Sequence, residues 1–374
     1  MRAFGGIVMG NINRNKIINV SATVLAGMIS VFATFCTLSR LNDANGELTV
    51  QMLASSLSMP QSVVANAVNN TEEIQSAVAI ATQPSTTATE KTTEKLAEQN
   101  EEITDDESQY TGEQYPVIEQ QFGSSGEGYD NFSVKNTTDY SIDYEQLLSN
   151  DLGFEIDNSD SPQVLIVHTH TTESYLINDN GYYYTDYPFR NTDSSRNMVA
   201  VGNEIVKSLN NNGISAVQAT EIHDTTYTGS YDRSEQTIYK YMEEYPDIKV
   251  ILDIHRDAVG YDDERGKYKP TFTYNGKKAA QIMIMSGYDP YNSYGLGHWQ
   301  ENLTFALKLQ QKAEQLYPGM TRPLYFGDFA YNMFINNGSL LIEVGTETNT
   351  LSEAKYTGKL LGNVVAEVLN ENKN

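Results

Sequence analysis

The stretch that decides the fold is QVLIVH at 163–168, which continues as THTTE up to Glu173. A short apolar run that ends in polar residues is typical of a buried strand. Comparable runs occur at 214–217, 249–255 (KVILDIH), 280–287 (AQIMIMSG) and 339–344 (SLLIEV). These runs predict the strands of one sheet.

Helical patterns separate the predicted strands. Residues 194–212 carry apolar side chains at the spacing of a helix face, namely Met198, Val201, Ile205 and Leu209. This pattern stops at Gly213, which is typical of a helix C-terminus. Further helices are predicted at 234–245, 299–317 and 352–371. The alternation predicts a single layered α/β domain at 156–374, with a mainly parallel sheet flanked by helices.

The N-terminal part of the chain predicts a membrane anchor. Residues 17–38 form a 22-residue stretch without a charged side chain, long enough to cross a bilayer. Basic residues precede it and the chain beyond is acidic, which places residues 1–16 in the cytoplasm and the rest outside. A cleaved signal peptide is the alternative, but the apolar run is long for one and lacks a small-x-small cleavage site.

Residues 39–155 predict an acidic linker of low complexity. The segment 41–160 has 23 acidic residues against three lysines and few large apolar ones, so it cannot bury enough surface to fold. We expect only residues 130–160 to pack at the edge of the domain. The net charge of −24 argues against nucleic-acid binding, and the lone cysteine, Cys36, excludes an internal disulfide.

Ionisable residues follow the predicted strands at the edge where an α/β sheet usually binds its ligand. His170 and Glu173 stand in an H-x-x-E arrangement, and His255 ends a distant strand. Two histidines and a glutamate are a usual ligand set for catalytic zinc, so these three predict a Zn²⁺ site. His168 is the alternative to His170, and strand alternation would let one bind metal and the other contact substrate. Glu343, at the end of another strand, is the predicted general base.

Other side chains are candidates for supporting roles. Asp253 shares a strand face with His255 and is expected either to orient it or to pair with Arg256. Arg256 is a candidate electrophile or carboxylate clamp. Tyr175 begins a tyrosine-rich loop. The sequence allows two interpretations of this loop: a lid that faces glycan, or a long loop whose aromatic residues cover the loop itself.

Four motifs in order, HTHTTESY, RNMVAVGNEIVKSLNNNGI, ILDIHRDA and LLIEVGTETNTLSEA, resemble the stage II sporulation protein P (SpoIIP) family. That family is a branch of the zinc-dependent N-acetylmuramoyl-L-alanine amidases. The resemblance implies a hydrolase of peptidoglycan that cuts the muramic acid–L-alanine amide, and peptide cross-links as well. It also implies action in forespore engulfment, with the transglycosylase SpoIID and the membrane protein SpoIIM as partners.

The resemblance implies site roles too. It makes His170 or His168, together with His255, the zinc ligands, and Glu343 the catalytic base. Such amidases take a third ligand from a glutamate that opens the following helix, and this sequence has no glutamate there. The third ligand is therefore Glu173, Asp193 or Asn197.

Two other functions remain compatible with the sequence. A metallocarboxypeptidase acting on cell-wall peptides would use Arg256 or Arg196 to clamp a free carboxylate. A non-catalytic scaffold would bind glycan through the tyrosine loop. The leading prediction is a membrane-anchored zinc amidase acting outside the cell.

Overall fold

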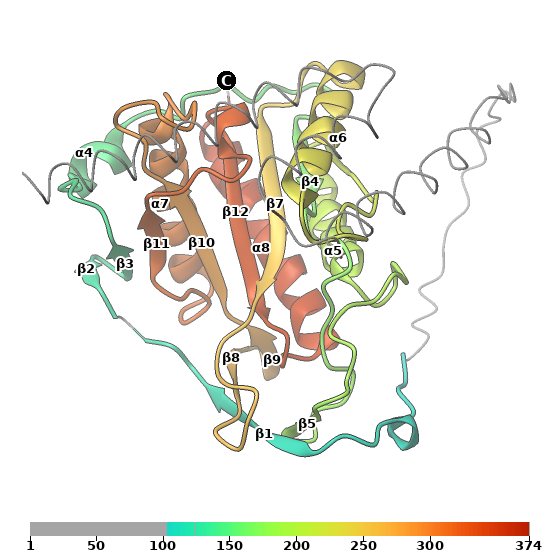
Figure 1. The fold of residues 1–374 in the computed structure, drawn as a ribbon. Helices are drawn as coiled ribbons and strands as arrows, with labels where there is room; N and C mark the ends of the chain where they lie inside the picture. Colours follow the sequence, from blue (N-terminus) through green and yellow to red (C-terminus); the bar gives the residue numbers. More distant parts are fainter. Residues whose placement is uncertain (1–102, 124, 374) are drawn as a thin grey trace, which may run out of the picture. The chain divides into compact units, whose positions relative to one another are not determined.

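An eight-stranded sheet forms the centre of the computed structural model, which describes residues 103–123 and 125–373 (Figure 1). Its strand order is β2 (Glu127–Tyr129), β3 (Phe132–Asn136), β11 (Leu324–Gly327), β10 (Ile282–Gly287), β12 (Ser339–Thr346), β7 (Val250–Asp257), β4 (Val164–Val167) and β6 (Ala216–Gln218). Only the pairs β2–β3 and β10–β12 of this sheet are antiparallel. The predicted α/β class with a mainly parallel sheet is confirmed for the described residues.

Four long helices accompany this sheet: α5 (Met198–Asn211), α6 (Ser230–Glu244), α7 (Trp299–Leu316) and α8 (Leu351–Glu371). Figure 1 shows α7 and α8 behind the sheet and α6 on its nearer side. The two faces of the sheet pack against different hydrophobic clusters, as strand β7 shows. Ile254 belongs to the main core, whereas Ile251 belongs to a smaller cluster that includes Ile238 of α6. Side chains alternate along a strand, so Asp253 and His255 lie on the same face as Ile251.

A second sheet of four strands was not predicted from the sequence. Its order is β5 (Tyr182–Tyr184), β1 (Gln114–Gln120), β8 (Lys267–Tyr274) and β9 (Lys277–Ala280). Strand β1 runs parallel to β8 and antiparallel to β5. The tyrosine-rich loop is therefore paired through β5 to a segment that lies far earlier in the chain.

The expected linker boundary at residue 155 needs correction. Within 103–155 the chain forms η2 (Glu107–Gln109), β1, β2, β3 and α4 (Tyr144–Ser149). Strands β2 and β3 extend the main sheet and α4 packs on α7. Packing at the edge was expected for residues 130–160, which include β3 and α4 but not β2. Strand β1 lies outside that range. These segments fold because they pair or pack with later residues: β2 and β3 at one edge of the main sheet, and β1 between β5 and β8.

The predicted membrane span at 17–38, the cytoplasmic segment 1–16 and residues 39–102 of the linker lie outside the described residues. Among the helices of the described part, none has both the length and the apolar character needed to span a bilayer.

Helices α5 and α8 approach closely at two glycines. A Cβ atom on Gly358 would lie 2.8 Å from the carbonyl oxygen of Val201, and one on Gly362 would lie 2.7 Å from that of Ile205. We expect Gly358→Val to lower the free energy of unfolding by about 1–3 kcal/mol or more, because the added atoms must push α8 away from α5. Chemical denaturation would measure this loss. Gly128→Val is the control, since nothing lies within 4 Å of a Cβ there; equal stability of both variants would contradict the prediction.

Candidate active site

The three central strands β4, β7 and β12 run parallel and bring three distant segments together. His255 of β7 pairs in register with Glu343 of β12. Beyond β4 the chain turns at 168–172 and carries His170 and Glu173 towards β7. The His170 and His255 rings are perpendicular, with centroids 5.3 Å apart. The structure thus assembles the residues that the sequence predicted from separate motifs.

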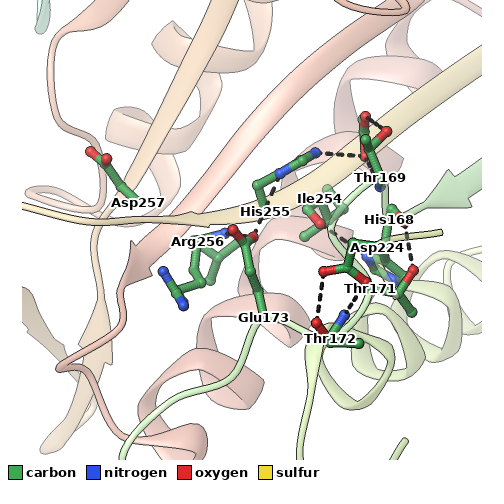
Figure 2. A network of polar contacts seen from close by, with 12 residues as sticks. His168, Thr169, Thr171, Thr172, Glu173, Asp224, Ile254, His255, Arg256 and Asp257 are labelled. Atoms are coloured by element: carbon green, nitrogen blue, oxygen red, sulfur yellow. Dashed lines mark hydrogen bonds and ion pairs between the residues drawn. The ribbon is translucent and has the colours of Figure 1, made fainter. Parts of the chain in front are cut away.

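His255 is held between two carboxylates (Figure 2). Its Nε2 lies 2.9 Å from Asp253 Oδ1, and its Nδ1 lies 3.6 Å from Glu173 Oε2. Asp253 is itself fixed by the amide and hydroxyl of Thr169, which donate hydrogen bonds of 2.9 and 2.7 Å. Burial opposes a charge on the imidazole, but the two carboxylates raise the pKa of His255 well above its usual value. Asp253 is thus positioned to orient His255, and Arg256 pairs elsewhere.

The spacing of the donor atoms suits a metal ion. Two ligand atoms that each lie about 2.1 Å from one tetrahedral zinc are roughly 3.4 Å apart, close to the 3.6 Å between His255 Nδ1 and Glu173 Oε2. His170 Nδ1 is buried and makes no hydrogen bond to any residue that the structure describes. Burial lowers the pKa of His170, which favours the neutral imidazole that binds metal.

The ligand cluster is not complete as it stands. Among residues 103–123 and 125–373, no group of three His, Cys, Asp or Glu side chains is gathered closely enough to hold an ion. The Glu173–His255 pair with the unpartnered Nδ1 of His170 is nevertheless a donor set of the right chemistry for zinc.

Glu343 lies beside His255 and forms no ion pair with any residue that the structure describes. Its Oε2 is buried and accepts no hydrogen bond from the described part of the chain. Burial is the main cause that raises the pKa of Glu343 to about 8, and His255 opposes the shift. A carboxyl group that exchanges a proton near neutral pH, next to a candidate metal site, has the properties of a general base.

His168 does not face this site, although alternation along the strand predicted that it would share the orientation of His170. Strand β4 ends at Val167, so the alternation does not continue through 168–170. His168 is fully buried, its Nδ1 lies 2.9 Å from the Ile254 carbonyl oxygen and its Nε2 lies 2.9 Å from the Gln218 amide nitrogen. With both nitrogens engaged and the side chain buried, His168 is placed to support the fold and not to reach a ligand.

Burial lowers the pKa of His168 to about 4, from a usual value of 6.5. Between these values the unfolded chain binds more protons than the folded one, so stability falls as the pH drops from 6.5 towards 4. The free energy of unfolding should fall between pH 7 and pH 5 in both wild type and His168→Gln. We expect the fall to be about 2 kcal/mol larger in wild type, because only wild type carries the buried imidazole. Urea titrations at both pH values would test this, and parallel losses would refute it.

The three candidates for a third ligand differ in position. Glu173 lies beside His255, whereas the carboxylate of Asp193 is exposed and accepts hydrogen bonds from the amide and hydroxyl of Ser195. Asn197 caps α5, and its side-chain oxygen accepts from the amide of Val199. Glu173 is the candidate whose position fits.

Arg256 and Tyr175 are buried and support the backbone. The guanidinium of Arg256 donates to Ser174 O, Phe189 O and Glu347 Oε2 at 2.8–3.0 Å, so it is not free to clamp a substrate. Tyr175 is 1% exposed and its hydroxyl donates to Val344 O, next to Glu343. Neither residue is placed to touch a substrate, contrary to the direct roles considered for them.

Several residues at the site were missed in the sequence. Arg190 pairs with the buried Asp224 and lies 3.6 Å from Glu173. Tyr227 stacks on the His170 ring at 4.8 Å, and Tyr231 lies parallel to the His255 ring at 6.4 Å. No motif marks these residues, because they come from a polar loop and from the start of α6.

A family model described as "Stage II sporulation protein P (SpoIIP)" matches residues 48–366. The stage II sporulation protein P of Bacillus subtilis (strain 168) is 30% identical over 221 residues, which are 56% of this chain and 51% of that protein. The chain thus matches about half the length of this curated relative.

Solved structures of amidases are also similar. The N-acetylmuramoyl-L-alanine amidase AmiC2 of Nostoc punctiforme is 11% identical, with 57% of this chain and 97% of that chain covered and a TM-score of 0.32. The CwlD amidase from Clostridioides difficile, solved in complex with the GerS lipoprotein, is 11% identical, with 56% and 98% covered and a TM-score of 0.33.

Proposed function

The chain belongs to the stage II sporulation protein P family, and from this premise we propose that it is a zinc-dependent peptidoglycan hydrolase. The bond cleaved is the amide between muramic acid and L-alanine, with peptide cross-links as a second target. The observation that carries the proposal is the meeting of His170, Glu173 and His255 beside the unpaired carboxyl of Glu343.

Each residue has a role that follows from its surroundings. His170, Glu173 and His255 would hold the metal, and Asp253 would keep the His255 ring in place. A zinc ion at this position would polarise the amide carbonyl, activate a water molecule and lower the pKa of Glu343. Glu343 would take a proton from the attacking water and return it to the departing nitrogen of L-alanine.

The proposal is tested by the products released from purified peptidoglycan. The full chain in detergent would be incubated with sacculi, with and without a chelator, and the soluble products identified by mass spectrometry. Stem peptides that begin with L-alanine, released only when zinc is present, are the expected result. Release of D-alanine alone would instead identify a carboxypeptidase, and no release with any metal would identify a scaffold.

The carboxypeptidase alternative needs an arginine that is free to bind a carboxylate, and both candidate arginines already have partners. Arg256 is fully engaged with backbone oxygens and Glu347, and Arg196 donates to the Thr104 carbonyl near Asp193. The amidase proposal needs no such arginine.

We also propose that residues 17–38 anchor the protein in the cell membrane, with residues 1–16 in the cytoplasm and the catalytic domain outside. The family premise adds forespore engulfment as the setting, and SpoIID and SpoIIM as partners. Protease protection in intact cells would test the topology, and co-purification from sporulating cells would test the partners.

A further inference from the structure

Four aromatic side chains lie beside the proposed catalytic centre, and each of them contacts His170 or another member of the group. They are Tyr227, Tyr231, Phe329 and Tyr331, called the aromatic strip below. Tyr231 stacks on Tyr331 with centroids 5.2 Å apart, and Tyr331 contacts Phe329 at 5.3 Å. Tyr227 covers His170. The aromatic strip therefore begins on the proposed metal ligands and continues away from them.

Two members of the strip offer large surfaces to solvent. Tyr227 is 68% exposed and Tyr331 is 39% exposed. Tyr331 also has φ of +42°, a left-handed conformation that costs free energy for a bulky aromatic residue. Strained residues of this kind cluster at functional sites, which sets Tyr331 apart from an ordinary surface tyrosine.

The loops that carry the strip are held in place. Arg233 donates hydrogen bonds to the carbonyl oxygens of His223, Thr226 and Thr228, which surround Tyr227. The buried side chain of Asn332, next to Tyr331, donates to Ser234 Oγ on α6 at 2.8 Å. The aromatic surfaces are thus fixed before any ligand arrives, which lowers the entropy lost on binding.

We propose that the aromatic strip binds the sugar of the glycan strand next to the scissile amide. The proposal rests on the proposed function, because the bond to be cut joins a sugar to a peptide and a sugar must lie beside the reacting atoms. The C–H groups of a sugar ring carry partial positive charge and pack well on the negative face of an aromatic ring. The guanidinium carbon of Arg190 lies 5.7 Å from the centroid of the Tyr227 ring, and Arg190 is already paired with Asp224 and Glu173. Arg233, which also lies near Tyr227, donates to three backbone carbonyl oxygens. The strip therefore suits an uncharged ring better than an anionic stem peptide.

The sequence left two interpretations open for the tyrosine-rich loop, a glycan-facing lid and aromatic cover for the loop itself. Tyr182, Tyr183 and Tyr184 form β5, which is paired with β1, and Tyr175 is buried. These contacts favour the second interpretation, and the surface that we propose for glycan is the aromatic strip.

Binding can be measured without hydrolysis in the full-length Glu343→Gln variant. The probes are glycan strands from which the stem peptides have been removed and, separately, free stem peptides. We expect Tyr227→Ala and Tyr331→Ala each to weaken binding of glycan by about five- to tenfold, and stem-peptide binding to stay unchanged. Tyr331→Phe should bind glycan as the parent does. Tyr239→Ala is the control, because Tyr239 is 48% exposed on the same helix as Tyr231.

Three results would overturn the inference: no binding of glycan by the parent, binding of glycan by both alanine variants as tight as by the parent, or a loss of binding confined to stem peptides. The outcome is separable from that of the proposed function. If wild type releases no stem peptide but the alanine variants still lose glycan binding, the hydrolase fails and the strip remains a glycan site. If wild type hydrolyses peptidoglycan and the alanine variants bind glycan normally, only the strip is refuted.

Discussion

Glu343→Gln should reduce the release of stem peptides by about 10²- to 10⁴-fold, the usual contribution of a general base. The substitution keeps the size of the side chain but removes its capacity to accept and return a proton. Glu343 is raised in pKa by burial and has no ion-pair partner among the described residues, so its loss removes no visible support of the fold. Initial rates on sacculi would measure the effect.

The variant must be shown to be otherwise intact. Its zinc content and its melting temperature should match those of wild type, because Glu343 is not one of the proposed ligands. Glu347→Gln is a poor control, since Glu347 pairs with the buried Arg256. Glu243→Gln is a better one, because it is the same substitution at a carboxylate that is exposed on α6 and is not a candidate ligand. Hydrolysis by Glu343→Gln at the wild-type rate would remove Glu343 from the mechanism.

The parts of the fold that could be predicted are those stabilised by apolar burial. Strands β4, β7 and β12 each contain a run of consecutive aliphatic residues, and every member of β4 is buried. Such runs identify a strand without knowledge of its partners. Because these strands are parallel neighbours, the convergence of their polar ends could also be expected.

Strand β8 shows why the second sheet could not be predicted. It reads KYKPTFTY, a polar sequence, yet Lys269 is 1% exposed. Its ammonium group lies 2.7 Å from Asp179 and 2.8 Å from Glu353, and both partners are remote in sequence. A buried lysine is tolerated only when such partners are present, and the sequence around β8 does not indicate which residues they are.

The residues proposed as metal ligands could be named from the sequence, and they remain a prediction, whereas the aromatic residues around them could not be named. His255 and Glu343 lie within the apolar strands β7 and β12, and His170 and Glu173 come shortly after β4, so the apolar runs of the sequence point to all four. The orientation of His168 could not be predicted, because it depends on the residue at which β4 ends. Tyr227 and Tyr331 could not be found either, since they reach the site from separate loops with no shared motif.

His255→Ala should lower zinc affinity by more than about 100-fold and abolish hydrolysis with it. Loss of a residue that only orients a ligand usually costs 10- to 100-fold in affinity, and His255 is proposed to be a ligand. The Nδ1 of His255 is the atom that lies 3.6 Å from Glu173 Oε2, so its removal leaves Glu173 without the neighbour that would share the ion. Elemental analysis after dialysis against a defined zinc buffer would measure the loss.

The same measurement decides the third ligand. Glu173→Ala should lose zinc to a similar extent, whereas Asp193→Ala should retain it, because Asp193 bonds to Ser195 and lies near Arg196. The zinc affinity of Asp253→Asn should lie between those of Glu173→Ala and Asp193→Ala, because this substitution alters only the group that orients His255. A full zinc complement in His255→Ala would show that the two histidines do not share an ion, and the hydrolytic mechanism would then lose its basis. Retention of zinc by Glu173→Ala together with its loss from Asp193→Ala would instead move the third ligand to the start of α5.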